Sequence, residues 1–221
     1  MGLYKDERKK YDEIIYVEPM SLVKAIYFAL LYSSNAGNEG NRNFKMVYGL
    51  LAGQISEDKV FVKKTFCINH GRENRVEVHG SSYIKIAELS STLQTQDMFI
   101  LGWFCSMNDV GTLPSVGNVN NQLGYQSMNA KAVGMQIKPE HFWHEELHDS
   151  IKFFRLKDIK APLKEWIEIP FRLADKKEEK FLKSLEEDYL LFKKEPNLGK
   201  ISDDELDMKI DEWIEKSKAF D

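Results

Sequence analysis

The chain has 221 residues, a length typical of one domain with an appendage and sufficient to bury a core without disulfide bonds. Hydrophobic residues make up 43% and charged residues 30% of the chain, which excludes a disordered protein and an integral membrane protein. The 31 Lys+Arg and 35 Asp+Glu give a net charge of −4, which argues against a nucleic-acid-binding module.

The sequence shows no targeting or membrane signal. The apolar run near residues 25–31 is too short to span a bilayer, and the N-terminal segment MGLYKDERKKYDE is too charged for a secretory signal. Two cysteines cannot build a disulfide framework. We therefore expect a cytoplasmic protein that binds neither membrane nor nucleic acid.

The first half of the chain alternates predicted strands and helices. Pro19 begins a helix, as proline does at a first helical position, and the helix carries apolar residues on two adjacent stripes. Such a wide apolar face suggests a sheet on one side and a second contact on the other. The expected strands are 13–18, 46–55, 59–68 and 97–106, and the expected helices are 19–32 and 81–96.

The second half begins with a polar, Gly- and Asn-rich loop at 108–121. The remaining expected elements are a short helix at 122–132, strands at 133–139 and 151–157, and a last strand that ends near Pro170. The pattern predicts an α/β domain over residues 1–173.

Residues 174–221 differ in composition and form a predicted helical extension. They hold 10 Lys+Arg and 15 Asp+Glu, and two amphipathic helices are expected at 175–195 and 202–220. Ser202 and Glu205 have the spacing of a capping box. Two interpretations stay open: both helices pack on their own domain, or they form a bundle with a partner.

The most specific motif is GWFCSMNDVGTLPSVGNVNNQ at residues 102–122. It resembles the signature of the MPN/JAMM family of zinc isopeptidases, G-W-[FY]-H-[ST]-H-P followed by S-x-x-D. Gly102, Trp103, Ser106, Ser115 and Gln122 match that pattern. Upstream MVYGLLAG, downstream AKAVGMQIKP and FFRLK resemble other strands of the family, so the resemblance covers about residues 14–157. It implies an MPN, cytidine-deaminase-like fold with a central mixed sheet flanked by helices.

The resemblance places non-ligating residues at the positions that bind zinc in active members. Cys105 and Met107 stand at the two histidine positions, Asn118 at the aspartate position, and Met46 at the position of the glutamate base. A thioether and a neutral amide are poor ligands for a borderline dication, and only Ser115 of the catalytic set remains. We expect no cofactor. Cys105 and Met107 could hold Cu(I), but we favour apolar filling of the vacated site.

A second motif, His144-Glu-Glu-Leu-His148, has the H-E-x-x-H pattern of zincin helices, and His141 shares the helical spacing. The stretch is short, lies between two predicted strands and has no evident distant third ligand. We therefore favour a surface connection containing Phe142 and Trp143, with zincin chemistry and incidental metal or pH sensing as the alternatives.

The resemblance implies a non-catalytic scaffold or regulatory subunit in a ubiquitin-type system. The expected partner is an active JAMM isopeptidase or another MPN protein, with a ubiquitin-like protein as a further candidate. The alternative functions are an enzyme with a rebuilt metal site and a pseudo-enzyme that binds ubiquitin-like proteins without cleavage. The residues expected to contact the partner are Tyr27, Leu30, Leu31, Leu206, Ile210 and Trp213.

Overall fold

The structure is a computed structural model of the whole chain. It describes residues 13–33, 44–71, 78, 80–107, 114–139, 147–174, 178–198 and 200–217, and gives only the backbone at 178–180 and 182–183.

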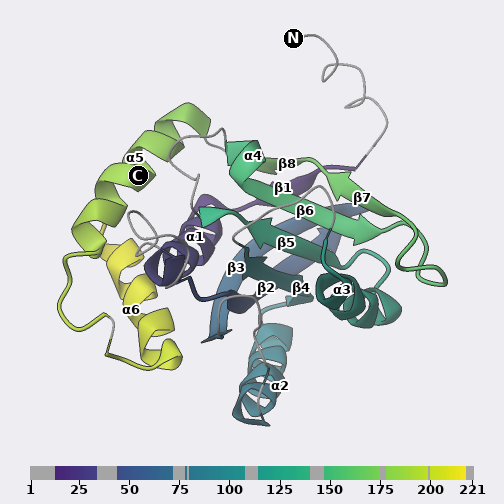
Figure 1. Cartoon of the computed structure of the whole chain (residues 1–221), viewed down its shortest axis with the longest axis horizontal. Coiled ribbons are helices and arrows are strands. Elements are labelled where there is room, and N and C mark those ends of the chain that lie inside the picture. The colour runs from purple at the N-terminus through teal and green to yellow at the C-terminus, as the bar shows by residue number, and fades with distance from the viewer. Residues whose placement is uncertain are drawn as a thin grey trace.

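Within these residues the chain forms eight strands and six helices (Figure 1). The strands are β1 (Ile15–Val17), β2 (Val47–Ser56), β3 (Lys59–His70), β4 (Phe99–Ser106), β5 (Val133–Ile137), β6 (Ile151–Leu156), β7 (Trp166–Ile169) and β8 (Phe171–Leu173). The helices are α1 (Pro19–Ser33), α2 (Gly80–Thr95), α3 (Val116–Met128), α4 (Leu147–Ser150), α5 (Glu178–Phe192) and α6 (Asp203–Lys216). This confirms the predicted α/β class.

The eight described strands form one mixed sheet in the order β7-β6-β5-β4-β2-β3-β1-β8. The β2–β3 hairpin is antiparallel, as predicted, whereas β4 pairs with β5 in parallel. Only Pro170 separates β7 from β8, although these strands are the two edges of the sheet. The sheet therefore has to curl until its edges lie one residue apart.

Residues along each strand alternate between two layers of core. Leu51 and Phe104 face a large cluster that includes α1, α5 and α6, whereas Leu50 and Trp103 face a smaller cluster that includes side chains of α2 and α3. The helices consequently cover opposite faces of the sheet, and Figure 1 shows α5 and α6 beside α1, away from α2 and α3.

Two expectations for the elements were wrong. The loop expected at 108–121 ends earlier, because Ser115 caps α3 and the helix begins at Val116. The last strand expected before Pro170 is followed by a further strand, β8, which pairs with β1 rather than with its neighbour in sequence. The capping box of Ser202 and Glu205 at the start of α6 is present.

The six side chains expected to contact a partner lie against their own chain instead. Tyr27, Leu30, Leu206 and Ile210 are at most 3% exposed, and Leu31 and Trp213 are partly buried against the same cluster. The second contact of the wide α1 face is therefore the chain's own tail. As a free interaction surface the set was wrong, because burying both apolar stripes within one chain removes more surface from water than leaving them exposed.

Candidate functional site

The candidate site lies where the end of β4 meets the start of α3. Close backbone approach shapes this strand: a Cβ on Gly102 would lie 1.8 Å from the Val133 carbonyl oxygen, and Gly102 adopts a φ of 155°. A Cβ on Gly49 of the adjacent β2 would lie 2.1 Å from the Phe104 ring. These glycines allow the strands to pack closely enough to bring the end of β4 against α3.

Four of the five residues expected at the degenerate zinc site come together here. Cys105 is the penultimate residue of β4, Met107 follows the strand, and Ser115 and Asn118 lie at the start of α3. The Asn118 side-chain amide donates a hydrogen bond to the Met107 sulfur at 3.1 Å, and the Ser115 hydroxyl accepts from the Asn118 backbone N–H at 3.2 Å.

Met46, the fifth residue, lies just before β2. Tyr48 of β2 stands opposite Cys105 of β4 in an antiparallel ladder. The same register continued by two residues places Met46 opposite Met107, and the hydrogen bond from the Val47 N–H to the Ser106 hydroxyl, 3.0 Å long, supports that continuation. Met46 therefore lies beside the other four positions, where the resemblance implied it.

The Cys105 thiol is held in its neutral form. The side chain is buried, and burial raises its pKa to about 12, against a smaller lowering by a hydrogen bond with Asn118. A thiol must lose its proton to become a metal ligand or a nucleophile. Cys105 is therefore suited to neither role at neutral pH.

The residues at this site do not fit zinc. A structural or catalytic zinc site needs thiolate, imidazole or carboxylate ligands. Here the donors are a protonated thiol, a thioether and an amide that is already bonded to the thioether. Met107 instead packs against the apolar cluster of Leu50, Trp103 and Cys105. This packing agrees with the hypothesis that apolar atoms fill the position of the metal.

Three buried side chains anchor α3 to the sheet. The Trp103 indole N–H donates to the Gln122 side-chain oxygen at 2.9 Å, and the Gln122 amide donates to Gln126 and to the Ala132 carbonyl. Gln126 in turn exchanges two hydrogen bonds with the backbone of Leu156 in β6. The match of Gln122 to the family motif therefore has a structural role, since it orients the helix that carries Asn118.

A tyrosine pair next to Cys105 was not predicted. The Tyr48 and Tyr125 hydroxyls lie 2.9 Å apart, and burial raises the pKa of both. Both rings belong to, or pack against, the cluster of Trp103 and Cys105. The sequence carries no signal for the pair, because its members lie 77 positions apart in separate elements.

Most of the histidine motif lies outside the described residues, namely His141, Phe142, Trp143 and His144. His148 is described: it is exposed in α4, and its ring centroid lies 4.5 Å from that of Phe171. Among the described residues no group of three or more His, Cys, Asp or Glu side chains is arranged to hold a metal ion. In that same part of the chain, no helix has the length and apolar character needed to cross a membrane.

Comparisons with known proteins agree with this geometry. Curated proteins yielded no match. One solved structure with similarity is the solution structure of protein DSY2949 from Desulfitobacterium hafniense, at 14% sequence identity and a TM-score of 0.47, covering 76% of this chain and 98% of that chain. The family model described as "JAB1/Mov34/MPN/PAD-1 ubiquitin protease" matches residues 13–131, which is more than half of the chain. The chain therefore belongs to the JAB1/Mov34/MPN/PAD-1 family of MPN-domain proteins.

Proposed function

We propose that this chain is a non-catalytic MPN-domain protein that acts in the cytoplasm as a scaffold or regulatory subunit of a ubiquitin-type system. The observation that carries the proposal is the site at the end of β4. Cys105 is buried and protonated, Asn118 is bonded to Met107, and Met46 stands where active relatives carry a base. A chain with this set has neither the ligands nor the general base for hydrolysis by a zinc-bound water.

The proposal includes pairing with an active JAMM isopeptidase or another MPN protein. The underside of the tail is already used within the chain, so the partner has to bind other surfaces. Leu190 and Leu191 of α5 and Met208 of α6 are each at least 55% exposed. Large apolar side chains in water favour protein association, and these three make the outer side of the tail the first region to test.

A cleavage assay tests the non-catalytic half of the proposal. The purified chain is incubated with ubiquitin dimers joined by an isopeptide bond, with and without added zinc, and elemental analysis measures bound metal. We expect no cleavage and no stoichiometric zinc. Cleavage that a chelator abolishes, or one zinc per chain, would instead support an enzyme with a rebuilt metal site.

Restoring the family's zinc set tests whether the loop geometry has been kept. The variant Met46→Glu, Cys105→His, Met107→His and Asn118→Asp should bind zinc in calorimetry, while the matched variant that retains Asn118 should bind it more weakly. Activity need not return, because the groups that orient the ligands are absent. A folded quadruple variant without zinc affinity would contradict the assignment of these four positions.

Pairing is tested with the exposed tail residues. The chain is captured from its native cell with the wild-type sequence and with Leu190→Asp and Leu191→Asp, and an MPN-family protein is quantified by mass spectrometry. We expect an MPN protein in near-stoichiometric yield with the wild type and at least tenfold less with the variants. Equal capture by wild type and variants would exclude this surface, and the lack of any MPN protein would contradict the pairing itself.

A further inference from the structure

The α6 helix docks on the domain through a row of aspartates. Asp203, Asp207 and Asp211 are spaced by four residues and therefore share one face of the helix. Beside this row lie the buried side chains of Leu206, Ile210 and Ile214. An acidic stripe next to an apolar stripe is the feature that α6 presents to the rest of the molecule.

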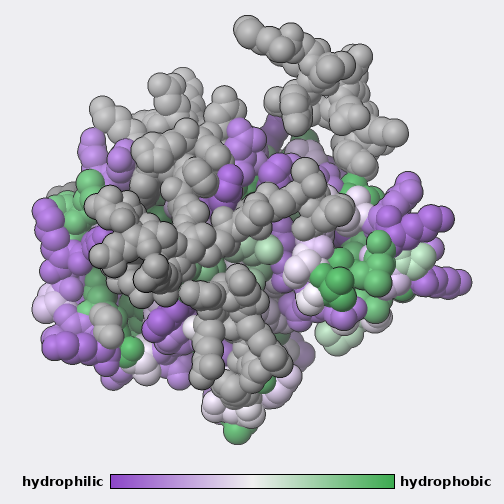
Figure 2. All heavy atoms as spheres, in the orientation of Figure 1, coloured by the Kyte–Doolittle hydropathy of each residue, from purple (hydrophilic) through white to green (hydrophobic). Residues whose placement is uncertain are grey.

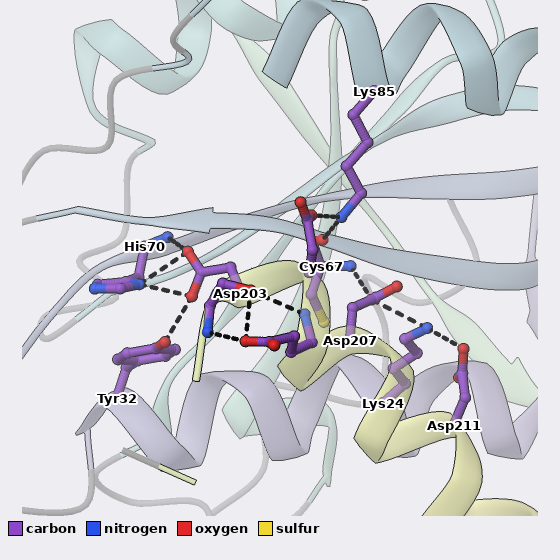
Figure 3. Close-up of polar contacts among 11 residues, drawn as sticks. Lys24, Tyr32, Cys67, His70, Lys85, Asp203, Asp207 and Asp211 are labelled. Carbon is purple, nitrogen blue, oxygen red and sulfur yellow. Dashed lines mark hydrogen bonds and ion pairs between the residues drawn. The ribbon is translucent and has the colours of Figure 1, made fainter. Parts of the chain in front are cut away.

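The surface that receives α6 is complementary in charge (Figure 3). We call it the α6 seat and define it by Lys24 of α1, Tyr32 of α1, Cys67 of β3, His70 of β3 and Lys85 of α2. The Lys24 ammonium lies 3.0 Å from Asp207 and 2.6 Å from Asp211. The Lys85 ammonium donates to Asp204 at 2.5 Å and to the Cys67 carbonyl at 2.9 Å.

The seat also offers neutral donors to the aspartates. The Cys67 backbone N–H donates to Asp207 at 2.6 Å, and the His70 backbone N–H donates to Asp203 at 2.9 Å. The Tyr32 hydroxyl donates to Asp203 at 2.6 Å, and the His70 ring nitrogen lies 2.8 Å from the same carboxylate. Each donor is placed by α1 or β3, so the seat exists in the domain independently of the tail's own fold.

An empty seat would be costly. The Lys24 side chain is only 5% exposed, and without α6 its ammonium would lose both carboxylates while still lying among apolar atoms. The apolar face of α1, including Tyr27 and Leu30, would also lose its cover. Whenever its own α6 leaves, the seat therefore favours another helix with the same acidic and apolar spacing.

The connection to α6 is long enough for exchange between chains. Residues 193–202 link α5 to α6, and ten extended residues reach roughly 33 Å. In the folded chain this hinge is compact: the Lys200 N–H bonds the Asn197 carbonyl, and Asn197 adopts a φ of 68° in the left-handed region. Extension of the hinge would release that conformation, which is sparsely populated by residues other than glycine.

We propose that the α6 seat accepts α6 of a second copy of this chain, so that two copies exchange their last helix in a symmetric dimer. The second copy is the occupant that fits without adjustment, since its aspartates and apolar side chains have identical spacing. All contacts of α6 re-form in the exchanged state, including the hydrogen bond from the Trp213 indole to Asp188 at 2.9 Å. Exchange of an identical element is a low-cost route to a dimer. The inference goes beyond the proposed function, because it does not require the domain to be non-catalytic.

Two charge-reversed chains test the exchange. Lys24→Glu damages the seat and leaves α6 intact, whereas the double variant Asp207→Lys with Asp211→Lys damages α6 and leaves the seat intact. Alone, each variant repels its own helix. Mixed, the intact α6 of the first meets the intact seat of the second, and the reversed partners also attract.

We expect a heterodimer in sedimentation velocity of the mixture, with an apparent dissociation constant at least tenfold below that of either variant alone. The matched control is Glu212→Lys, an equal charge change at an exposed position of α6, which should not pair with the Lys24→Glu chain. Folded variants that remain monomeric after mixing would overturn the proposal.

A second measurement covers the case in which Lys24→Glu does not fold. A labelled peptide with the sequence of residues 200–217 is added to the full-length Asp207→Lys, Asp211→Lys chain, and its anisotropy and the chain's melting temperature are recorded. We expect binding and a raised melting temperature, with at least tenfold weaker binding of a peptide carrying the same two lysines. No binding and no rise in melting temperature would show that the seat cannot accept a helix in trans, and would overturn the proposal.

Discussion

Replacing Lys24 by methionine should destabilise the folded chain more than any loss of a surface ion pair. Burial alone would lower the pKa of Lys24, but the nearby carboxylates, Asp207 first, raise it above its ordinary 10.5. The folded state therefore favours the charged ammonium. In Lys24→Met the Asp207 carboxylate, whose side chain is 12% exposed, keeps only the Cys67 N–H as a close partner among the contacts described.

The structure sets the size of the effect. Removing one member of a buried ion pair costs about 3–5 kcal/mol, since an uncompensated charge stays behind. The second carboxylate, Asp211, is 55% exposed and adds at most about 1 kcal/mol. Methionine retains the apolar stem of the side chain, which favours the lower end of the range. We expect the free energy of unfolding to fall by about 3 kcal/mol.

Urea denaturation followed by circular dichroism at pH 7 measures this loss. The double variant with Asp207→Asn should recover at least half of it, because asparagine still accepts from the Cys67 N–H and leaves no buried charge. The control is Lys152→Met, whose pair with Glu168 is partly exposed on both sides and should be worth less than about 1 kcal/mol. The reasoning is refuted if Lys24→Met costs no more than Lys152→Met, or if the double variant is less stable than Lys24→Met alone.

Three further predictions follow from the same contacts. In the folded chain Cys105 should resist iodoacetamide at pH 8, since burial raises its pKa to about 12, and peptide mass mapping in urea should show rapid labelling only after unfolding; fast labelling of the native chain would contradict this. Burial opposes ionisation of Asp203, but hydrogen bonds led by that of His70 hold its pKa below the ordinary 3.8, so its contribution to stability is present above about pH 4 and is lost as the pH falls through the lower, folded-state value. Asp203→Asn should accordingly flatten the acid side of the stability profile, whereas an unchanged slope between pH 2 and 5 would show that the carboxylate is not responsible. Gly102→Ala should cost roughly 2 kcal/mol or more, because its Cβ would lie 1.8 Å from a carbonyl oxygen of the next strand, whereas Gly124→Ala, in open space within α3, should be neutral or stabilising.

The α3 helix shows why part of the site could not be predicted from local pattern. Its sequence, VGNVNNQLGYQSM, contains two glycines and three asparagines and has low intrinsic helix propensity. The helix forms because Ser115 caps it and because Gln122 and Gln126 bond to the sheet. Those partners lie in β4, in β6 and just before β5, so no window of neighbouring residues reveals them.

The tail shows the same limit for association. Amphipathic stripes predicted that α1 and α6 each bury an apolar face, and the structure confirms that burial. Periodicity does not state which surface covers a stripe, and a partner and the chain's own domain would produce the same pattern. The aspartates of α6 were interpreted only as part of a charged tail, although three of them contact the α6 seat.

The amino-acid sequence by itself determined the α/β class, most of the strands and helices, the family, and the identity of the residues at the former zinc site, because these depend on local periodicity and on short motifs with fixed spacing. Only the tertiary structure decided that Cys105, Met107 and Asn118 pack together as neutral groups, that β8 closes the sheet beside β1, and that α6 lies on Lys24 and His70. These outcomes depend on contacts between positions far apart in the chain, where burial and charge complementarity choose among arrangements that the local sequence leaves equal.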